Sequence, residues 1–160
     1  MNTAARKYRP RISTLMNLCE VNYMLMLRVL ADKENEGEQR CFFISDFLSY
    51  TVKINEVTRY TSLVTISQDI NASFTTNSPN KSSNELALTH LLQPRMVMRL
   101  YHDARVAEVI SSQDIHHVKP RNDYPNDLMH LPDEKQQINH FLKEWLQLCF
   151  ELGQVKLTLR

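Results

Sequence analysis

A short segment of the sequence, Tyr101 to Arg105, gathers four side chains that can take part in chemistry: Tyr101, His102, Asp103 and Arg105. A histidine beside a carboxylate can act as a general base, because hydrogen bonding orients the imidazole ring and shifts its pKa. Neighbouring residues of a strand point to opposite faces, so His102 and Asp103 cooperate only if a turn redirects one of them. The alternative is that Asp103 closes a turn through local backbone hydrogen bonds while His102 lies at the sheet edge.

Two further groups of polar residues are candidates to join this segment. Glu56 and Arg59 lie near another strand end, where they either form a structural ion pair with Asp103 or Arg105 or help to bind a ligand. The stretch from Asp123 to Asn126 is typical of a turn, although polar loop groups also line ligand sites. The candidate ligand-binding residues are Glu56, Arg59, Tyr101, Arg105, Tyr124 and Asn126, and, if the protein is an enzyme, the candidate catalytic residues are His102, Asp103 and Asp123.

Many familiar kinds of site are excluded because the chain has only two glycines, Gly37 and Gly153. A phosphate-binding glycine loop, a G-x-S-x-G elbow and an EF-hand loop each need glycine where the backbone turns tightly or approaches a ligand. His140 and Glu144 have a chelating spacing on a helix, but no third ligand or HExxH pattern accompanies them. No serine or cysteine stands in a recognisable nucleophile motif. We therefore expect no metal and no cofactor, and an active site, if present, built from side chains in turns.

Charge and cysteine content bear on the partners and the location of the protein. Nineteen Lys and Arg against eighteen Asp and Glu leave a net charge of +1, so nucleic-acid binding is not expected. The three cysteines, Cys19, Cys41 and Cys149, have no CxxC spacing, and the first and last fall in apolar helical patterns typical of buried thiols. No secretory signal and no apolar run of about 18 residues is found, which favours a cytoplasmic protein without a membrane segment.

The length of 160 residues indicates a single domain, and helical patterns lie near both of its ends. Helical spacing predicts a first helix, capped by Ser13 and running to about Ala31. Its second half, Tyr23 to Leu30, is apolar almost all round, so we expect it to be covered on more than one side or to form an interface. The final helix is capped by Asp133, with Gln136 completing a capping box, and it ends at Gly153 because of the backbone conformation that glycine allows at a helix end. Three methionines of the first helix are interpreted as core filling: Met16, Met24 and Met26.

Strand patterns lie between these helices, after a charged turn that contains Gly37. Apolar runs, alternation and β-branched residues predict strands over 41–44, 48–55 and 61–68, with a turn near Arg59. A hairpin is predicted from 96–101 and 105–111, turning at His102 to Ala104. We expect an Asn- and Ser-rich loop over 69–83, a short helix over 84–92, an irregular stretch over 113–132 and a short last strand over 155–159.

This order of elements predicts an α+β fold of two layers. An antiparallel sheet of about four to five strands would carry the N-terminal and C-terminal helices on one face. All 160 residues would form one domain, with the loop over 69–83 as a flexible insertion.

Several strings of the sequence together resemble the YqiB-like bacterial family, a domain of unknown function. They occur in the same order and span about residues 8 to 150. The resemblance implies a cytoplasmic bacterial protein and supplies no activity; the segment of about 71–83 is an insertion relative to the family pattern. The strings are Leu18-Cys19-Glu20 with Asn22-Tyr23, Glu56-Val57-Thr58-Arg59-Tyr60-Thr61, Arg99-Leu100-Tyr101-His102-Asp103-Ala104-Arg105, Asp123-Tyr124-Pro125-Asn126, and Asp133-Glu134-Lys135 leading to Glu144-Trp145-Leu146.

Three hypotheses for the function remain open. The first is a small binding or adaptor module that engages a protein or a small-molecule ligand through the polar strand-end cluster. The second is a hydrolase or transferase of small molecules, with His102 as acid or base, Asp103 or Asp123 orienting it, and Arg59 or Arg105 binding an anion. The third is a structural subunit of an obligate complex or a homodimer.

Overall fold

The computed structural model describes residues 11–70, 94–113 and 133–155 of the chain. These ranges form two helices and five strands, in the order α1 (Ile12–Leu30), β1 (Gln39–Ser45), β2 (Leu48–Val57), β3 (Thr61–Ile70), β4 (Arg95–Tyr101), β5 (Val106–Ser112) and α3 (Glu134–Leu152). Neither of the two helices within these ranges is long and apolar enough to cross a membrane.

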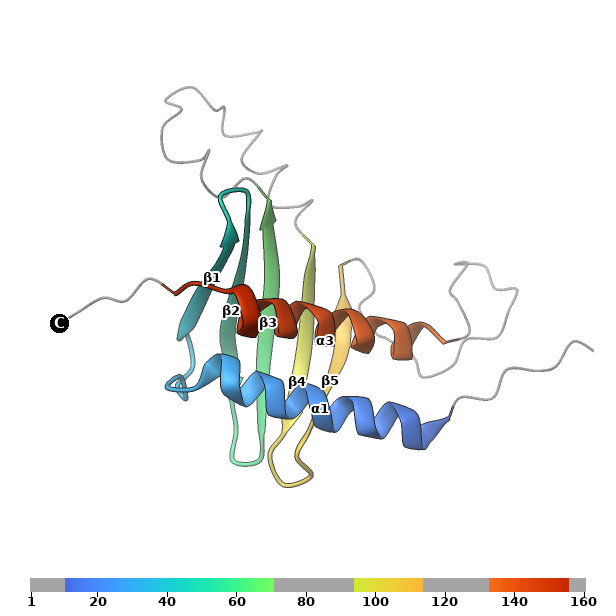
Figure 1. The fold of residues 1–160 in the computed structure, drawn as a ribbon. Helices are drawn as coiled ribbons and strands as arrows, with labels where there is room; N and C mark the ends of the chain where they lie inside the picture. The colour runs from blue at the N-terminus through green and yellow to red at the C-terminus, as the bar shows by residue number, and fades with distance from the viewer. Residues whose placement is uncertain (1–10, 71–93, 114–132, 156–160) are drawn as a thin grey trace, which may run out of the picture.

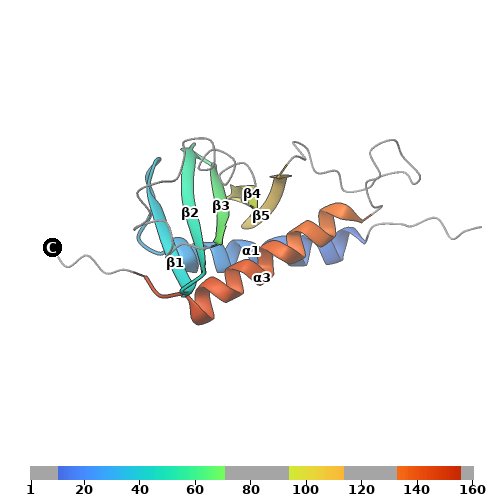
Figure 2. The ribbon, with the colours of Figure 1, turned by 90° about the horizontal axis from the view of Figure 1, so that it is seen from above.

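The five strands form one antiparallel sheet in the order β1-β2-β3-β4-β5, so each strand pairs with its neighbours in sequence. Both helices lie across the same face of this sheet (Figures 1 and 2). The α+β architecture predicted from the sequence, with terminal helices on one face of an antiparallel sheet, is therefore confirmed.

Alternation along the strands decides which side chains form the core. Successive residues of a strand point to opposite faces, and on β3 the residues Val64 and Ile66 are fully buried while their neighbours are only partly buried. The facing sides of the two helices complete the core. Its largest fully buried side chains are Tyr50, Met26, Ile66, Met98, Leu100, Leu142 and Leu146.

Helix α1 is covered on two sides, because it contacts both α3 and β5. A third side faces solvent, where Met16 and Met24 are 43% and 55% exposed. The interpretation of these two methionines as core filling is wrong, and only Met26 is buried. Their positions follow from the helical repeat, which turns Met24 away from the buried stripe that contains Tyr23 and Met26.

A buried polar contact joins the two helices to the edge strand β5. Asn22 of α1 donates through Nδ2 to the backbone oxygen of Asn139 in α3 (3.0 Å), and both residues are fully buried. The side chain of Asn139 donates to the Lys135 backbone oxygen (2.8 Å) and accepts the backbone N–H of Val109 (3.1 Å). Because Val109 belongs to an edge strand, this contact satisfies a backbone donor that the sheet leaves unpaired.

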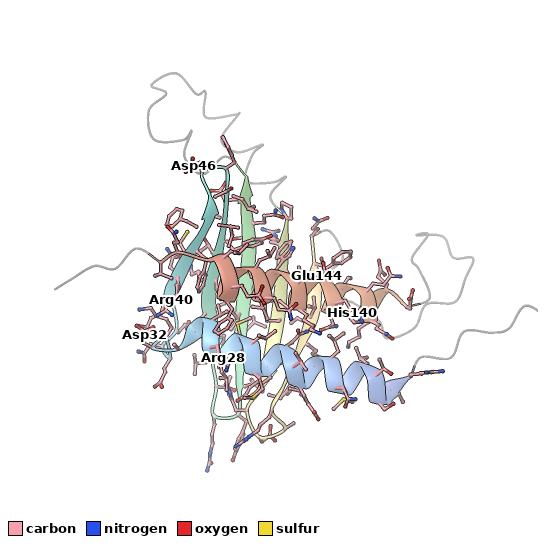
Figure 3. The ribbon with its side chains drawn as sticks, in the orientation of Figure 1. Arg28, Asp32, Arg40, Asp46, His140 and Glu144 are labelled. Atoms are coloured by element: carbon pink, nitrogen blue, oxygen red, sulfur yellow. The ribbon has the colours of Figure 1, made fainter. Side chains whose placement is uncertain are left out.

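The turn between α1 and β1 is held by charged side chains. Gly37 has a φ of +85°, the left-handed conformation that glycine adopts without strain. Arg40 of β1 donates through Nη1 to the Val29 backbone oxygen (3.1 Å) and pairs through Nη2 with Asp32 (Figure 3). These contacts fix the end of α1 against the sheet, beside the candidate site described below.

The predicted helix ends differ in detail from the observed ones. Helix α1 begins at Ile12 after Arg11, and no side chain caps it, so Ser13 is not its cap. At the start of α3, the Asp133 carboxylate accepts a hydrogen bond from the side chain of Gln137 (2.9 Å) and caps no backbone N–H of the first turn, so the predicted capping box is absent.

Gly153 does end α3, but its backbone is not left-handed, with a φ of −69°. A Cβ atom there would lie 2.2 Å from the Cys149 oxygen and 2.8 Å from Phe42 Cδ1, so close packing requires this glycine. Asp69 and Ile70, predicted as loop, belong to β3, and Arg105 lies in the turn before β5. Gln154 forms one bridge with Phe43, whereas Val155, predicted to begin a last strand, lies in no strand, and Gln113 lies in a turn after β5. The other residues predicted as loop, short helix, irregular stretch or last strand, 71–92, 114–132 and 156–159, lie outside the described ranges.

Candidate functional site

Two turns lie side by side at one end of the sheet, below α1 in Figure 1. The β2–β3 turn comprises Thr58 to Tyr60, and the β4–β5 turn comprises His102 to Arg105. They are joined directly, because the backbone N–H of His102 donates to the Tyr60 backbone oxygen (2.9 Å). The structure therefore brings together the two strand ends that the sequence analysis singled out.

The β2–β3 turn closes without glycine or proline through the side chain of Thr58. The Thr58 N–H donates to the Thr61 oxygen (2.8 Å), and the Thr61 N–H donates to Thr58 Oγ1 (3.1 Å). The two threonine hydroxyls also lie 2.8 Å apart. A threonine hydroxyl can replace a backbone group in a turn in this way, which explains why no conventional turn signal marks the position.

His102 is held between two hydroxyl groups. Its Nε2 lies 2.8 Å from Ser62 Oγ of β3, and its Nδ1 lies 3.1 Å from the Tyr23 hydroxyl of α1. The rings of Tyr23 and His102 meet edge to face, with centroids 5.9 Å apart. A ring with both nitrogens bonded and one edge packed has a fixed orientation.

A cavity of about 340 Å³ lies at this end of the sheet, with Ser62 and His102 in its wall. The end of α1 and the turn after it supply one side, and the ends of β2, β3 and β4 supply the other. Lys33, Glu34 and Thr58 are its further polar lining residues. The aliphatic lining consists of Leu27, Leu30, Ala31, Ile54, Val57 and Leu100.

Tyr101 points away from this cavity. Leu100 is buried on the helix-covered face, so the next residue of the strand faces the opposite side. The Tyr101 hydroxyl donates to Glu108 Oε1 (3.0 Å), and partial burial together with this carboxylate raises the pKa of the phenol. Tyr101 and His102 are thus separated by the sheet, as strand alternation requires.

The other predicted residues of the two turns are exposed. Among the residues that the structure describes, no ion pair joins Glu56, Arg59, Asp103 and Arg105 to one another. The Arg59 guanidinium lies over the Tyr60 ring, 5.1 Å from its centroid. Arg105 has a φ of 55°, so its backbone takes the left-handed position of the turn. The remaining candidates, Asp123, Tyr124 and Asn126, lie outside the described ranges.

Sequence reasoning missed the two partners of His102. Ser62 interrupts the apolar alternation that continues through Val64 and Ile66, and a polar residue on a buried strand face needs a hydrogen-bond partner. That signal was available. Tyr23 carried no comparable signal, because a tyrosine in an apolar helical stripe fits ordinary core packing.

A second cavity, of about 570 Å³, lies at the opposite end of β4, between that strand and α3. Its lining includes Arg95, Phe141 and Trp145 and none of the predicted site residues. His140 and Glu144 are exposed on α3 (Figure 3). Within 11–70, 94–113 and 133–155, no group of three His, Cys, Asp or Glu side chains is placed to hold a metal ion.

The buried cysteines have unreactive surroundings. Burial, with the nearby Glu108 charge second, raises the pKa of Cys19 from an ordinary 9.0 to about 11, and burial raises that of Cys149 to about 12. Their interpretation as buried thiols is confirmed.

Comparison with known proteins agrees with the strings noted in the sequence. The chain is 40% identical over 148 residues to the uncharacterized protein YqiB of Escherichia coli strain K12, a match that covers 92% of this chain and 94% of that protein. The same values hold for YqiB of E. coli O6:H1 and O157:H7. No solved structure matches. The family described as "Protein of unknown function (DUF1249)" matches residues 25–155, and the chain therefore belongs to the DUF1249 family.

Proposed function

We propose that the protein is a small-molecule binding module and that the cavity beside His102 is its binding site. The observation that carries the proposal is that Ser62 and His102, already joined to each other, lie in the wall of a largely aliphatic cavity of about 340 Å³. Binding sites for small molecules typically have this size, with mostly apolar walls and a few polar groups that set orientation.

The polar groups of the cavity are held in place before a ligand arrives. His102 is fixed by Tyr23 and Ser62, and its backbone is fixed by Tyr60. Side chains that are already ordered lose little conformational entropy on binding. This arrangement supports recognition of one polar group by Ser62 and His102, with the aliphatic walls enclosing the rest of the ligand.

Binding is favoured over catalysis because of what His102 contacts. The hydrolase or transferase hypothesis assigns a carboxylate, Asp103 or Asp123, to orient the imidazole. Both ring nitrogens are instead within hydrogen-bond distance of hydroxyl groups. A hydroxyl does not stabilise an imidazolium as a carboxylate does, so this arrangement suits ligand recognition better than proton transfer.

A different surface supports the third hypothesis, an obligate complex or homodimer. The solvent side of α1 carries Ile12, Met16 and Met24, which are exposed apolar residues on a helix otherwise packed against α3 and the sheet. Sedimentation velocity at micromolar and nanomolar concentrations tests this alternative. A species of twice the chain mass, lost in Met24→Glu, supports it, and a monomer throughout contradicts it for the homodimer.

The binding proposal is tested by screening a library of small metabolites against the full chain by thermal shift, with Leu27→Trp as the blocking variant. Leu27 lines the cavity and is exposed, so a larger side chain there fills the opening without disturbing the core. Met24→Trp is the matched control, since Met24 is exposed on the same helix but is not a lining residue.

We expect compounds that raise the melting temperature of the wild-type chain and of Met24→Trp, but not of Leu27→Trp. The proposal fails if no compound stabilises the chain, or if Leu27→Trp responds as the wild type does. Mass spectrometry of each stabilising compound after incubation supplies a further criterion. Conversion of a compound that depends on His102 would replace the binding proposal by the enzyme hypothesis.

A further inference from the structure

We infer that Tyr23, His102 and Ser62 form a directed chain of hydrogen bonds that offers the Ser62 hydroxyl as a donor to a neutral carbonyl group of the ligand. The inference rests on the proposed function and specifies its ligand class. It follows from the hydrogen-bonding capacity of each group, the shape of the cavity and the charges at its edge.

The donor and acceptor roles in this hydrogen-bond chain are fixed first at Tyr23. A neutral imidazole has one nitrogen that donates and one that accepts, so the two contacts of His102 run in one sense or the other. If His102 Nδ1 donated to Tyr23, the buried phenol would keep a hydrogen with no acceptor among the described residues. A buried donor without a partner is unfavourable by about 1–3 kcal/mol. In the other sense the unpaired hydrogen belongs to Ser62, which lines the cavity, whereas Tyr23 does not. Tyr23 therefore donates to Nδ1, and the ring proton resides on Nε2.

The next step passes this direction to Ser62. With its proton on Nε2, His102 donates to Ser62 Oγ across 2.8 Å. Ser62 keeps its own hydroxyl hydrogen, for which the described part of the chain supplies no further acceptor. Because Ser62 is a lining residue of the cavity, this hydrogen is available to a ligand there. Successive hydrogen bonds polarise one another, so the last donor of the chain is strengthened.

The acceptor that fits this donor is a neutral carbonyl oxygen. Around the opening of the cavity, the charge of Lys33 is opposed by Glu34, which also lines it, and by Asp32, whose carboxylate lies 3.7 Å from the Lys33 amine. An anionic ligand gains little from such a balance and loses its hydration against aliphatic walls. A ketone, ester or amide on a compact aliphatic body meets the donor without that loss.

The inference is tested by nuclear magnetic resonance titration of the ¹⁵N-labelled full chain with three probes of one shape: cyclohexyl methyl ketone, cyclohexanecarboxylate and 1-cyclohexylethylammonium. We expect the ketone to bind most tightly and to shift the amide signals of the cavity residues. Ser62→Ala should weaken ketone binding roughly 3- to 10-fold through loss of one hydrogen bond. Ser67→Ala is the matched control, because Ser67 lies on the same strand but alternates to the other face.

A second measurement determines, without any ligand, which way the hydrogen bonds between Tyr23, His102 and Ser62 run. Long-range ¹⁵N–¹H spectra distinguish a protonated ring nitrogen from an unprotonated one, and we expect the proton on Nε2 of His102. Tyr23→Phe removes the donor to Nδ1, so the two ring signals should move toward those of a mixture of tautomers. This change in tautomer shows that Tyr23 positions the proton of His102. A purely structural role of Tyr23 would leave the tautomer unchanged.

Each result has a separate meaning. If none of the three probes shifts cavity signals in the wild-type chain while other compounds bind there, the carbonyl inference fails and the binding proposal stands. The inference also fails if the ammonium or the carboxylate binds as tightly as the ketone, if Ser62→Ala leaves ketone affinity unchanged, or if the ring proton is found on Nδ1. If no compound of any class binds at the cavity, the proposed function itself fails.

Discussion

Ser62 and His102 are 40 residues apart in sequence, yet their Oγ and Nε2 atoms lie 2.8 Å apart. The register of the sheet produces this contact. Ser62 of β3 is paired with Leu100 of β4, and His102 follows two residues later on the same face. A shift of one residue in this pairing would turn the two side chains to opposite faces. The candidate site therefore depends on the β3–β4 register.

Replacing His102 by alanine should destabilise the fold by about 1–3 kcal/mol, because the hydroxyls of Tyr23 and Ser62 both lose their hydrogen-bond partner in a partly buried place. The free energy of unfolding is measured by urea denaturation. Asp103→Ala, one residue further along and exposed, is the control and should change it by less than about 0.5 kcal/mol. Equal losses in the two variants would contradict the buried hydrogen-bond chain.

The two glycines should respond differently to substitution. Gly153→Ala places a methyl group against the Cys149 oxygen and Phe42, and overpacking of this kind destabilises by about 1–3 kcal/mol. At Gly37 a side chain would meet open space, and the left-handed φ is the main restriction. Gly37→Asn should therefore be nearly neutral, since asparagine tolerates this conformation. Thermal unfolding of both variants measures the two losses of stability. A larger loss in Gly37→Asn than in Gly153→Ala would contradict the prediction.

Asn139→Ala should destabilise the fold and loosen the edge strand β5. The variant leaves the Val109 N–H without its acceptor and removes the bond to Lys135, so we expect a loss of about 1–3 kcal/mol. Hydrogen exchange of the Val109 amide should be faster as well. His140→Ala, the next residue on α3 but exposed, serves as the control and should alter neither quantity. Unchanged exchange at Val109 in Asn139→Ala would show that the edge is protected in another way.

The raised pKa values of Cys19 and Cys149 predict a pattern of alkylation and a dependence of stability on pH. Thiolates react and thiols do not, so with pKa values of about 11 and 12, Cys19 and Cys149 should resist iodoacetamide at pH 8 while partly buried Cys41 reacts first. Peptide mapping by mass spectrometry after brief exposure measures this order. Early modification of Cys19 in the folded chain would contradict it.

The same raised pKa values make the folded state hold its thiol protons more tightly than the unfolded state does. Well below pH 9 both thiols are protonated in the folded and the unfolded state, and there is no effect. As the pH rises from about 9 toward 11 and 12, the unfolded chain releases protons first and folding stability falls. Urea midpoints measured across this range should decline less in Cys19→Ala than in the wild-type chain. An equal decline in Cys19→Ala and in the wild-type chain would show that titration of other groups causes the loss of stability.

Much of the architecture could be predicted because it depends on local patterns. Alternation located the strands, and helical spacing located both helices. The exposure of Met24 could not be predicted in this way. The second half of α1 is apolar almost all round, so its sequence does not show which side the neighbouring elements leave exposed. The end of α3 was predicted at Gly153 for a different reason from the observed one, because a close approach to Phe42 is a tertiary contact that no local signal encodes.

The candidate site was predicted only in its location. His102 and the two turns could be singled out because reactive residue types and strand ends are visible in a sequence. Tyr101 was predicted to join His102 in one polar cluster, but strand alternation places the two side chains on opposite faces of the sheet. The contact with Tyr23 required knowledge of how α1 crosses the sheet, which depends on packing across 79 residues of separation.

The hydrogen bond between Asn22 and Asn139 has a consequence for the synthesis of the chain. The two residues are 117 positions apart, whereas every ladder of the sheet joins strands that follow one another. On the ribosome, the strands can pair as they emerge, but Asn22 of α1 gains its partner only after the 117 residues up to Asn139 of α3 have been made. During that interval the apolar side of α1 has only the growing sheet to cover it. Synthesis of α3 is thus the step that covers the apolar side of α1 between the two helices.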